Sequence, residues 1–167
     1  MRKDDSPVFR LILVAGLLLW VAGGCQQSAA VPVSIGAFAP NYLLLVVAVL
    51  APYMPTFGSA TVGLLSGIVQ GGLAGANLTA YGVSRIVAGL TVGKIHQSEL
   101  AQSPLVAALT AAVTVVVGQA AVLFLAPTVN VGAFVLATMG TAIYNGVLAV
   151  PLDWAIGKVL SNSAHDR

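Results

Sequence analysis

The sequence has few charged residues and very few residues that ligate metals. Of its 167 residues, seven are Lys or Arg, five are Asp or Glu, two are His and one is Cys. The single cysteine, Cys25, excludes an intramolecular disulfide, and with His96 and His165 it makes no cluster with metal-ligand spacing. A net charge of +2 from scattered basic residues is too small for a phosphate-binding surface. We therefore expect no metal, no cofactor and no nucleic-acid partner.

The residue pairs that catalysis needs are also missing from the sequence. Acid–base and nucleophilic catalysis require a partner within hydrogen-bond reach of the reacting group. We find no paired carboxylates in an apolar run, no Ser or Cys beside a histidine, and no loop that could cradle a phosphate. The sequence therefore predicts a protein that is not an enzyme.

Hydrophobic residues make up 58% of the chain and charged residues only 7%, against about 25% charged in ordinary soluble domains. Spanning helices need about 20 mainly apolar residues each. The sequence thus predicts an all-α integral membrane protein with one polytopic domain, 1–167. Pro40 is expected in the first turn of the second span, and Ser103 with Pro104 to start the fifth. The expected spans are roughly 9–25, 41–52, 57–75, 78–93, 104–125 and 131–151.

After the sixth span, we expect Pro151 to act as a hinge that kinks or ends the helix. Residues 152–160 would then form a short helix on the membrane surface, with Trp154 at the level of the lipid headgroups.

Basic residues test the six-span count independently. With six spans and a cytoplasmic N-terminus, six of the seven basic residues fall on the cytoplasmic side, as the positive-inside rule requires, and both termini are cytoplasmic. These residues are Arg2, Lys3, Arg10, Lys94, Lys158 and Arg167.

The N-terminal segment has two interpretations. A basic start, the apolar run 11–24 and then Cys25 have the general shape of a lipoprotein signal. Alternatively, the run is a first spanning helix that stays attached. We favour the attached helix because several more spans follow, and because Ala22 stands where a lipoprotein signal usually has Leu.

One predicted span carries a small residue at every fourth position. In an α-helix these residues form a nearly side-chain-free stripe, which lets another helix approach closely in lipid. We call this stripe the glycine seam. It packs either against the protein's own helices, which we favour, or against the helix of a separate protein. Its members are Ser59, Gly63, Gly67, Gly71 and Gly75.

The seventh basic residue, Arg85, lies in the middle of the fourth predicted span, where an arginine costs about 2.5 to 3.5 kcal/mol. Asn77, Tyr81 and Arg85 are spaced four apart and share a helix face. We expect this face to point into the bundle. Three roles stay open for it: a packing network, a site for an anionic ligand, and a contact with an acidic residue of a partner. The polar residue expected to meet it is Gln70, Gln119 or Asn145.

Several short motifs follow one another in a recognisable order. They are Gln27 and Ser28; Ala39, Pro40 and Asn41 before LLLVVAVLA; VGLLSGIVQGGLAG followed by VAGLTVGKI; and Tyr144, Asn145 and Pro151 in YNGVLAVPL. Taken in this order, they resemble the MreD family of rod shape-determining proteins over roughly residues 9–160. The sequence departs from the family at Gly71, where an acidic residue is frequent, and at Arg85, where the family is usually apolar.

The resemblance implies a non-enzymatic scaffold of cell elongation and lateral peptidoglycan synthesis in the bacterial inner membrane. Its partner would be the single-span protein MreC and, through it, a RodA-type glycan polymerase, a class B penicillin-binding protein and the actin-like MreB filament. The implied fold is a six-helix bundle similar to the substrate-binding components of energy-coupling-factor transporters. A vitamin-binding component of such a transporter is therefore the alternative function, and a lipoprotein-like or small channel protein is a third.

Overall fold

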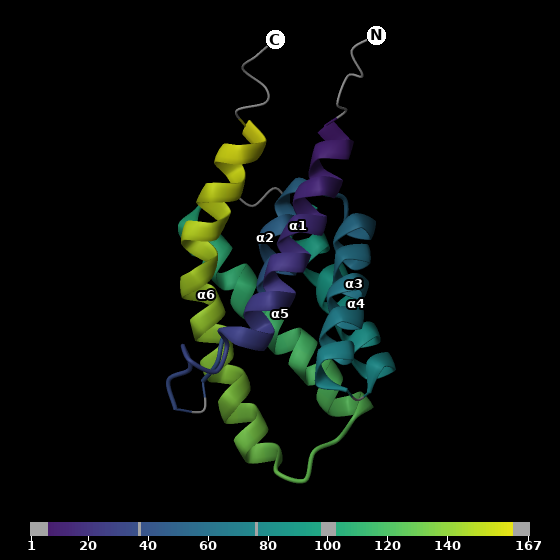
Figure 1. The fold of residues 1–167 in the computed structure, drawn as a ribbon, viewed down its shortest axis with the longest axis vertical. Helices are drawn as coiled ribbons and strands as arrows, with labels where there is room; N and C mark the ends of the chain where they lie inside the picture. The colour runs from purple at the N-terminus through teal and green to yellow at the C-terminus, as the bar shows by residue number, and fades with distance from the viewer. Residues whose placement is uncertain (1–6, 37, 76, 98–102, 162–167) are drawn as a thin grey trace.

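The computed structural model describes residues 7–36, 38–75, 77–97 and 103–161, and within these ranges the regular structure is helical (Figure 1). This confirms the all-α prediction for the described residues. The start of α1 and the end of α6 lie at the same end of the molecule (Figure 1). The elements are α1 (Pro7–Ser28), α2 (Tyr42–Leu50), η1 (Ala51–Tyr53), α3 (Thr56–Ala74), α4 (Leu78–Gln97), α5 (Pro104–Leu125) and α6 (Val131–Ser161).

Four of these helices are long and apolar enough to cross a membrane: α1, α3, α5 and α6. The chain is therefore a multi-pass membrane protein by the length and composition of its helices. The nine residues of α2 rise only about 14 Å, roughly half the hydrocarbon thickness. Helix α4 has 20 residues but carries Arg85 and a polar last turn. A count of six complete spans stays a prediction.

Helix α2 forms the centre of the bundle. Its residues 43–50 are all apolar and all buried, as expected for a helix that is hydrophobic on every side. Around it pack α1, α3, α4, α5 and α6. The expectation that Pro40 occupies its first turn is wrong. Asn41 caps the helix by accepting a hydrogen bond from the Leu44 amide at 3.1 Å, and Pro40 precedes that cap.

Two other predicted helix boundaries have different outcomes. Helix α5 starts as expected, with the Ser103 hydroxyl accepting from the Val106 amide at 3.2 Å and Pro104 in the first turn. A separate surface helix at 152–160 is wrong, because α6 runs unbroken through Pro151 to Ser161. Pro151 is exposed at the surface of α6, and the helix continues past one lost hydrogen bond.

Candidate functional site

The glycine seam of α3 faces α4, its neighbour in sequence, and the two helices run side by side (Figure 1). A methyl group on Gly63 would collide with the Arg85 carbonyl. One on Gly67 would lie 2.7 Å from Gly82 Cα, and one on Gly71 would lie 2.9 Å from Leu78 Cα. The seam is therefore filled by the backbone of this protein's own helix.

Helix α4 contributes its own glycines to the same contact. A methyl group on Gly89 would collide with the carbonyl of Ser59, the first member of the seam. One on Gly93 would lie 2.8 Å from Thr56 Cα. Small residues on both helices thus bring two backbones into direct contact, which is how close helix pairs form in lipid.

The last member of the predicted seam has a different place. Gly75 is the C-cap of α3 with φ +64°, a left-handed conformation that favours glycine, and a methyl group there would meet no other atoms within 4 Å. Asn77 follows with φ 52° and is exposed. Asn77 therefore belongs to the turn between α3 and α4 and does not share the buried face of Arg85.

Arg85 is completely buried, and all three guanidinium nitrogens donate hydrogen bonds. Nη2 and Nε donate to Gln70 Oε1 at 2.8 and 3.2 Å, and Nη1 donates to Ser84 Oγ at 3.4 Å. The guanidinium carbon also lies 5.5 Å from the centre of the Tyr81 ring, within cation–π range. The buried charge of Arg85 is thus hydrogen-bonded by neutral groups of α3 and α4.

The Gln70 oxygen also accepts a hydrogen bond from Asn41 Nδ2 at 3.5 Å, at the start of α2. The Asn41 backbone in turn meets the buried Asn145 side chain of α6. Its amide donates to Asn145 Oδ1 at 3.0 Å, and its carbonyl accepts from Asn145 Nδ2 at 2.8 Å. We call Arg85, Gln70, Asn41 and Asn145 the polar network. It joins four helices inside the apolar bundle.

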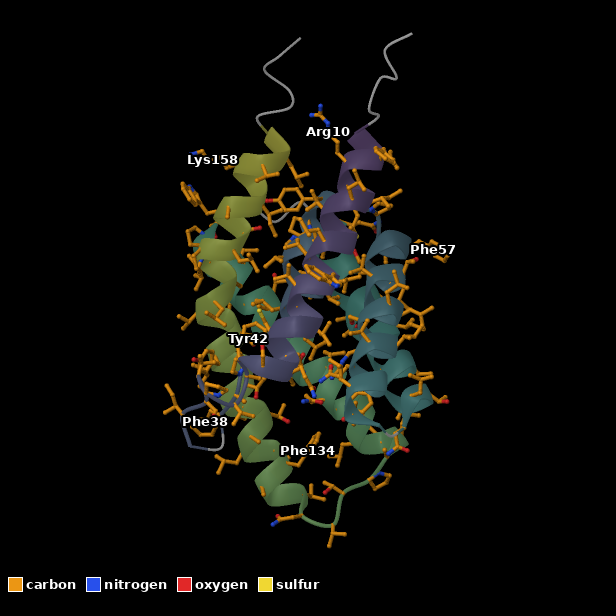
Figure 2. The ribbon with its side chains drawn as sticks, in the orientation of Figure 1. Arg10, Phe38, Tyr42, Phe57, Phe134 and Lys158 are labelled. Carbon is orange, nitrogen blue, oxygen red and sulfur yellow. The ribbon has the colours of Figure 1, made fainter. Side chains whose placement is uncertain are left out.

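Hydrogen bonds from α6 and α1 also fix the segment that leads into α2. Thr141 Oγ1 donates to the Ala39 carbonyl at 2.8 Å, and the Tyr144 hydroxyl donates to the Val33 carbonyl at 2.8 Å. Gln26 Oε1 of α1 accepts from the Tyr42 amide at 2.9 Å. The start of α2 is therefore held from both flanks, and Figure 2 labels Tyr42 and the neighbouring Phe38 in this region.

The structure brings three of the predicted intramembrane polar residues into one network: Gln70, Arg85 and Asn145. Tyr81 lies beside it through its ring. Gln119 is half-buried on α5 and makes no hydrogen bond within the described part of the chain. Asn41 was not among the predicted site residues. An asparagine directly before an apolar run is a helix N-cap signal that could have found it.

The polar network fixes the positions of its helices relative to one another. The hydrogen bonds run in one chain, from the Arg85 guanidinium to the Gln70 carboxamide, from there to the Asn41 side chain, and from the Asn41 backbone to the Asn145 carboxamide. Among the described residues no three His, Cys, Asp or Glu side chains come close enough to hold a metal ion. Cys25, the residue of the lipoprotein interpretation, is half-buried inside α1, which continues to Ser28.

Comparison with known proteins gives no relative for this chain: no family model, no curated protein and no solved structure matches it.

Proposed function

We propose that this protein is a non-enzymatic scaffold of the bacterial inner membrane that serves the cell-elongation complex, as the resemblance to the MreD family implies. In this role it crosses the membrane six times with both termini in the cytoplasm. It binds an MreC-like single-span protein through its transmembrane helices and thereby supports lateral peptidoglycan synthesis and rod shape.

One observation carries the proposal: motifs that are far apart in the sequence, and that together carry the resemblance, are hydrogen-bonded to each other. Asn41 comes from the motif before α2, and Asn145 from the motif in α6, 104 residues later. The two are joined by a pair of hydrogen bonds. Such pairing supports the idea that the motifs belong together and hold one specific arrangement of helices.

The contacts of the glycine seam bear on where a partner helix binds. Since the backbone of α4 already packs against Gly63, Gly67 and Gly71, we propose that the partner binds to the outward apolar faces of the bundle. This revises the hypothesis that the seam docks the partner. A Gly67→Leu variant would then fail because α3 and α4 separate, so loss of the partner in that variant does not locate the interface.

The test is co-purification together with cell shape. In a rod-shaped host that carries this gene, depletion of the protein is expected to make cells round. The tagged protein is expected to carry a single-span coiled-coil protein through detergent extraction. Cells that stay rod-shaped during depletion, with no such protein recovered, would contradict the proposal.

The alternative, a vitamin-binding transporter component, requires Arg85, Asn77 and Gln119 to converge on a ligand in an apolar pocket. Asn77 instead lies exposed in the turn between α3 and α4. Arg85 is fully buried and donates to Gln70 and Ser84, so its charge is directed at the protein's own side chains. Native mass spectrometry of the gently extracted protein separates the two functions, because a stoichiometric vitamin-sized ligand is expected only of the transporter component.

A further inference from the structure

A groove of about 390 Å³ runs along the outside of the bundle between α1 and α6, with α2 as its floor. Helix α1 contributes Leu18 and Val21 to the lining, α2 contributes Leu45 and Val46, and α6 contributes Leu152 and Ala155. The lining is almost entirely apolar, and the two walls come from helices that are both long enough to span a membrane. Its chemistry suits a hydrocarbon chain.

A basic side chain lies beyond one end of this groove. Arg10, Val14 and Leu18 are spaced four residues apart on α1 and so share one face of that helix. Val14 and Leu18 pack against the buried core, and Leu18 lines the groove. In Figure 2 the Arg10 side chain extends from the start of α1 toward the last turns of α6. Arg10 thus lies two helical turns beyond Leu18, about 12 Å along α1, where a long molecule that extends out of the groove at this end would reach it.

A second groove offers a comparison, because charges of both signs lie near its end. It has a volume of about 630 Å³, lies between α5 and α6, and includes Val147, Val150 and Pro151 in its lining. Past Val150 and Pro151 it continues into a hollow lined by Asp153 and Trp154. The α1–α6 groove thus leads toward Arg10, whereas the α5–α6 groove leads toward the Asp153 carboxylate and Trp154, with Lys158 Nζ 5.2 Å from the centre of the Trp154 ring.

We infer that the α1–α6 groove is a binding site for an anionic phospholipid, with one acyl chain along α2 and the phosphate at Arg10. Hydrocarbon matches the apolar lining, and the headgroup phosphate matches the guanidinium, which hydrogen-bonds phosphates with good geometry. The end of the bundle that carries Arg10 is the one predicted to face the cytoplasmic leaflet, where anionic lipids attract basic residues. This inference does not depend on the proposed role in cell elongation.

The experiment is native mass spectrometry of the full chain extracted from vesicles of equal parts phosphatidylglycerol and phosphatidylcholine. We expect the wild-type protein to retain one phosphatidylglycerol in preference to phosphatidylcholine. Arg10→Gln should lower that preference about five-fold, the factor expected for one basic residue at an anionic membrane surface. Lys94→Gln, which removes an exposed cation at the end of α4, is the matched control and should leave the preference unchanged.

A second pair of variants tests the groove itself. Val21 and Val147 are both exposed valines, one lining each groove. Val21→Trp fills the α1–α6 groove and should abolish retention of phosphatidylglycerol, whereas Val147→Trp should retain it. The inference is overturned if the wild type retains both lipids equally or retains none, or if the two controls lose the lipid as fully as Arg10→Gln and Val21→Trp.

A partner helix in the groove would give a different result. In that case Val21→Trp would lose a co-purifying protein and keep its phosphatidylglycerol, which also overturns the lipid assignment. Conversely, loss of the lipid preference in Arg10→Gln with cell shape intact would support the lipid site and leave the proposed function to its own test.

Discussion

At the scale of single residues, the arginine inside the bundle is the feature that the surrounding structure most needs to satisfy. Arg85 has no carboxylate partner among the described residues, and the Gln70 oxygen accepts two of its hydrogen bonds. A guanidinium tolerates this arrangement because its charge is delocalised and only weakly hydrated. The sequence predicted that Arg85 faces the protein. It did not choose between Gln70, Gln119 and Asn145, because that choice depends on which helices are neighbours.

Removing the acceptor side chain of Gln70 should therefore lower the free energy of unfolding more than removing the cation of Arg85. We expect Gln70→Leu to destabilise the protein by about 3 kcal/mol, since it leaves a buried charge without its main partner. Arg85→Met removes the charge and keeps much of the side-chain volume, so its cost should be smaller. Thermal unfolding in detergent micelles measures both changes.

The double variant completes the test of this pair. Because Gln70→Leu harms the protein through the orphaned guanidinium, adding Arg85→Met should recover part of the lost stability. Additive costs in the double variant would show that the two side chains act independently and would contradict this account.

A second titratable residue, His96, gives a prediction about pH. It lies beyond the predicted span 78–93, near the end of α4. Its Nε2 is buried without a hydrogen-bond partner, and burial lowers the pKa of His96 below its ordinary 6.5. As pH falls, His96 is therefore protonated in the unfolded chain before it is protonated in the folded protein. The contribution of His96 to stability is fully present above pH 6.5 and decreases below it.

We expect the unfolding temperature to fall as the pH is lowered from 7.5 to 5.5, and to fall less in His96→Gln than in the wild type. The nearby Tyr53 hydroxyl keeps its proton in this range, because burial and the Asp153 carboxylate raise the pKa of Tyr53 to about 12. Tyr53 thus still donates to Asp153 Oδ1, at 3.3 Å. Equal pH dependence in wild type and His96→Gln would rule out His96 as the source.

At the scale of elements, the hairpin of α3 and α4 shows why a small-residue stripe does not identify its own partner. The spacing of Gly63, Gly67 and Gly71 predicts a close helix contact. The turn at Gly75 and Asn77, with both residues in left-handed conformations, brings α4 back onto that stripe. The nearest helix in sequence therefore occupies the surface where a separate protein's helix would otherwise pack.

Two glycines of α3 give a matched pair for this contact. Gly67→Ala places a methyl group against the Tyr81 carbonyl and Gly82, so α3 and α4 must separate, and we expect a loss of about 1 to 3 kcal/mol. A methyl group on Gly72 meets nothing within 4 Å, so Gly72→Ala should be neutral or gain up to about 1 kcal/mol from helix propensity. Thermal unfolding of both variants measures the difference. Similar changes in stability for the two variants would show that helix propensity, and not the contact between α3 and α4, determines the effect of an added methyl group.

The buried helix α2 depends on a side chain from another element. Asn145→Ala removes the partner of both the Asn41 amide and the Asn41 carbonyl. Since each buried unsatisfied group costs about 1 to 3 kcal/mol, we expect a large drop in stability and faster hydrogen exchange in α2. The control is Asn130→Ala, which removes the exposed acceptor of the Ala133 amide at the start of α6 and should cost only about 1 kcal/mol. Unchanged exchange in α2 would contradict a holding role for Asn145.

At the scale of the whole molecule, the apolar runs predicted the helices well, because residues such as Pro55, Gly75 and Pro104 stand at their ends. Ser103 with Pro104 began α5 as expected. The run at 41–52 was harder to interpret, because a short apolar stretch looks the same whether it crosses lipid or is enclosed by other helices. Residues 43–50 are enclosed on all sides, a fact of tertiary packing that composition does not contain. The continuation of α6 through Pro151 likewise depends on the surroundings of the helix, since a proline in a helical run can end it or be tolerated within it.

The last prediction concerns topology, since α2 is too short to settle the span count by length. The elements alternate in direction, so the turn near Ser34 and the turn near Asn130 lie toward the opposite end of the bundle from η1 (Figure 1). Six crossings with a cytoplasmic N-terminus would place Ser34 and Asn130 outside, and Met54 and Arg167 inside. Alkaline phosphatase, which is active only in the periplasm, should therefore be active when fused after Ser34 or Asn130. It should be silent after Met54 or Arg167. Activity after Met54, with the Arg167 fusion still silent, would mean that α2 enters the bilayer without crossing it. Activity after Arg167 would require an odd number of crossings.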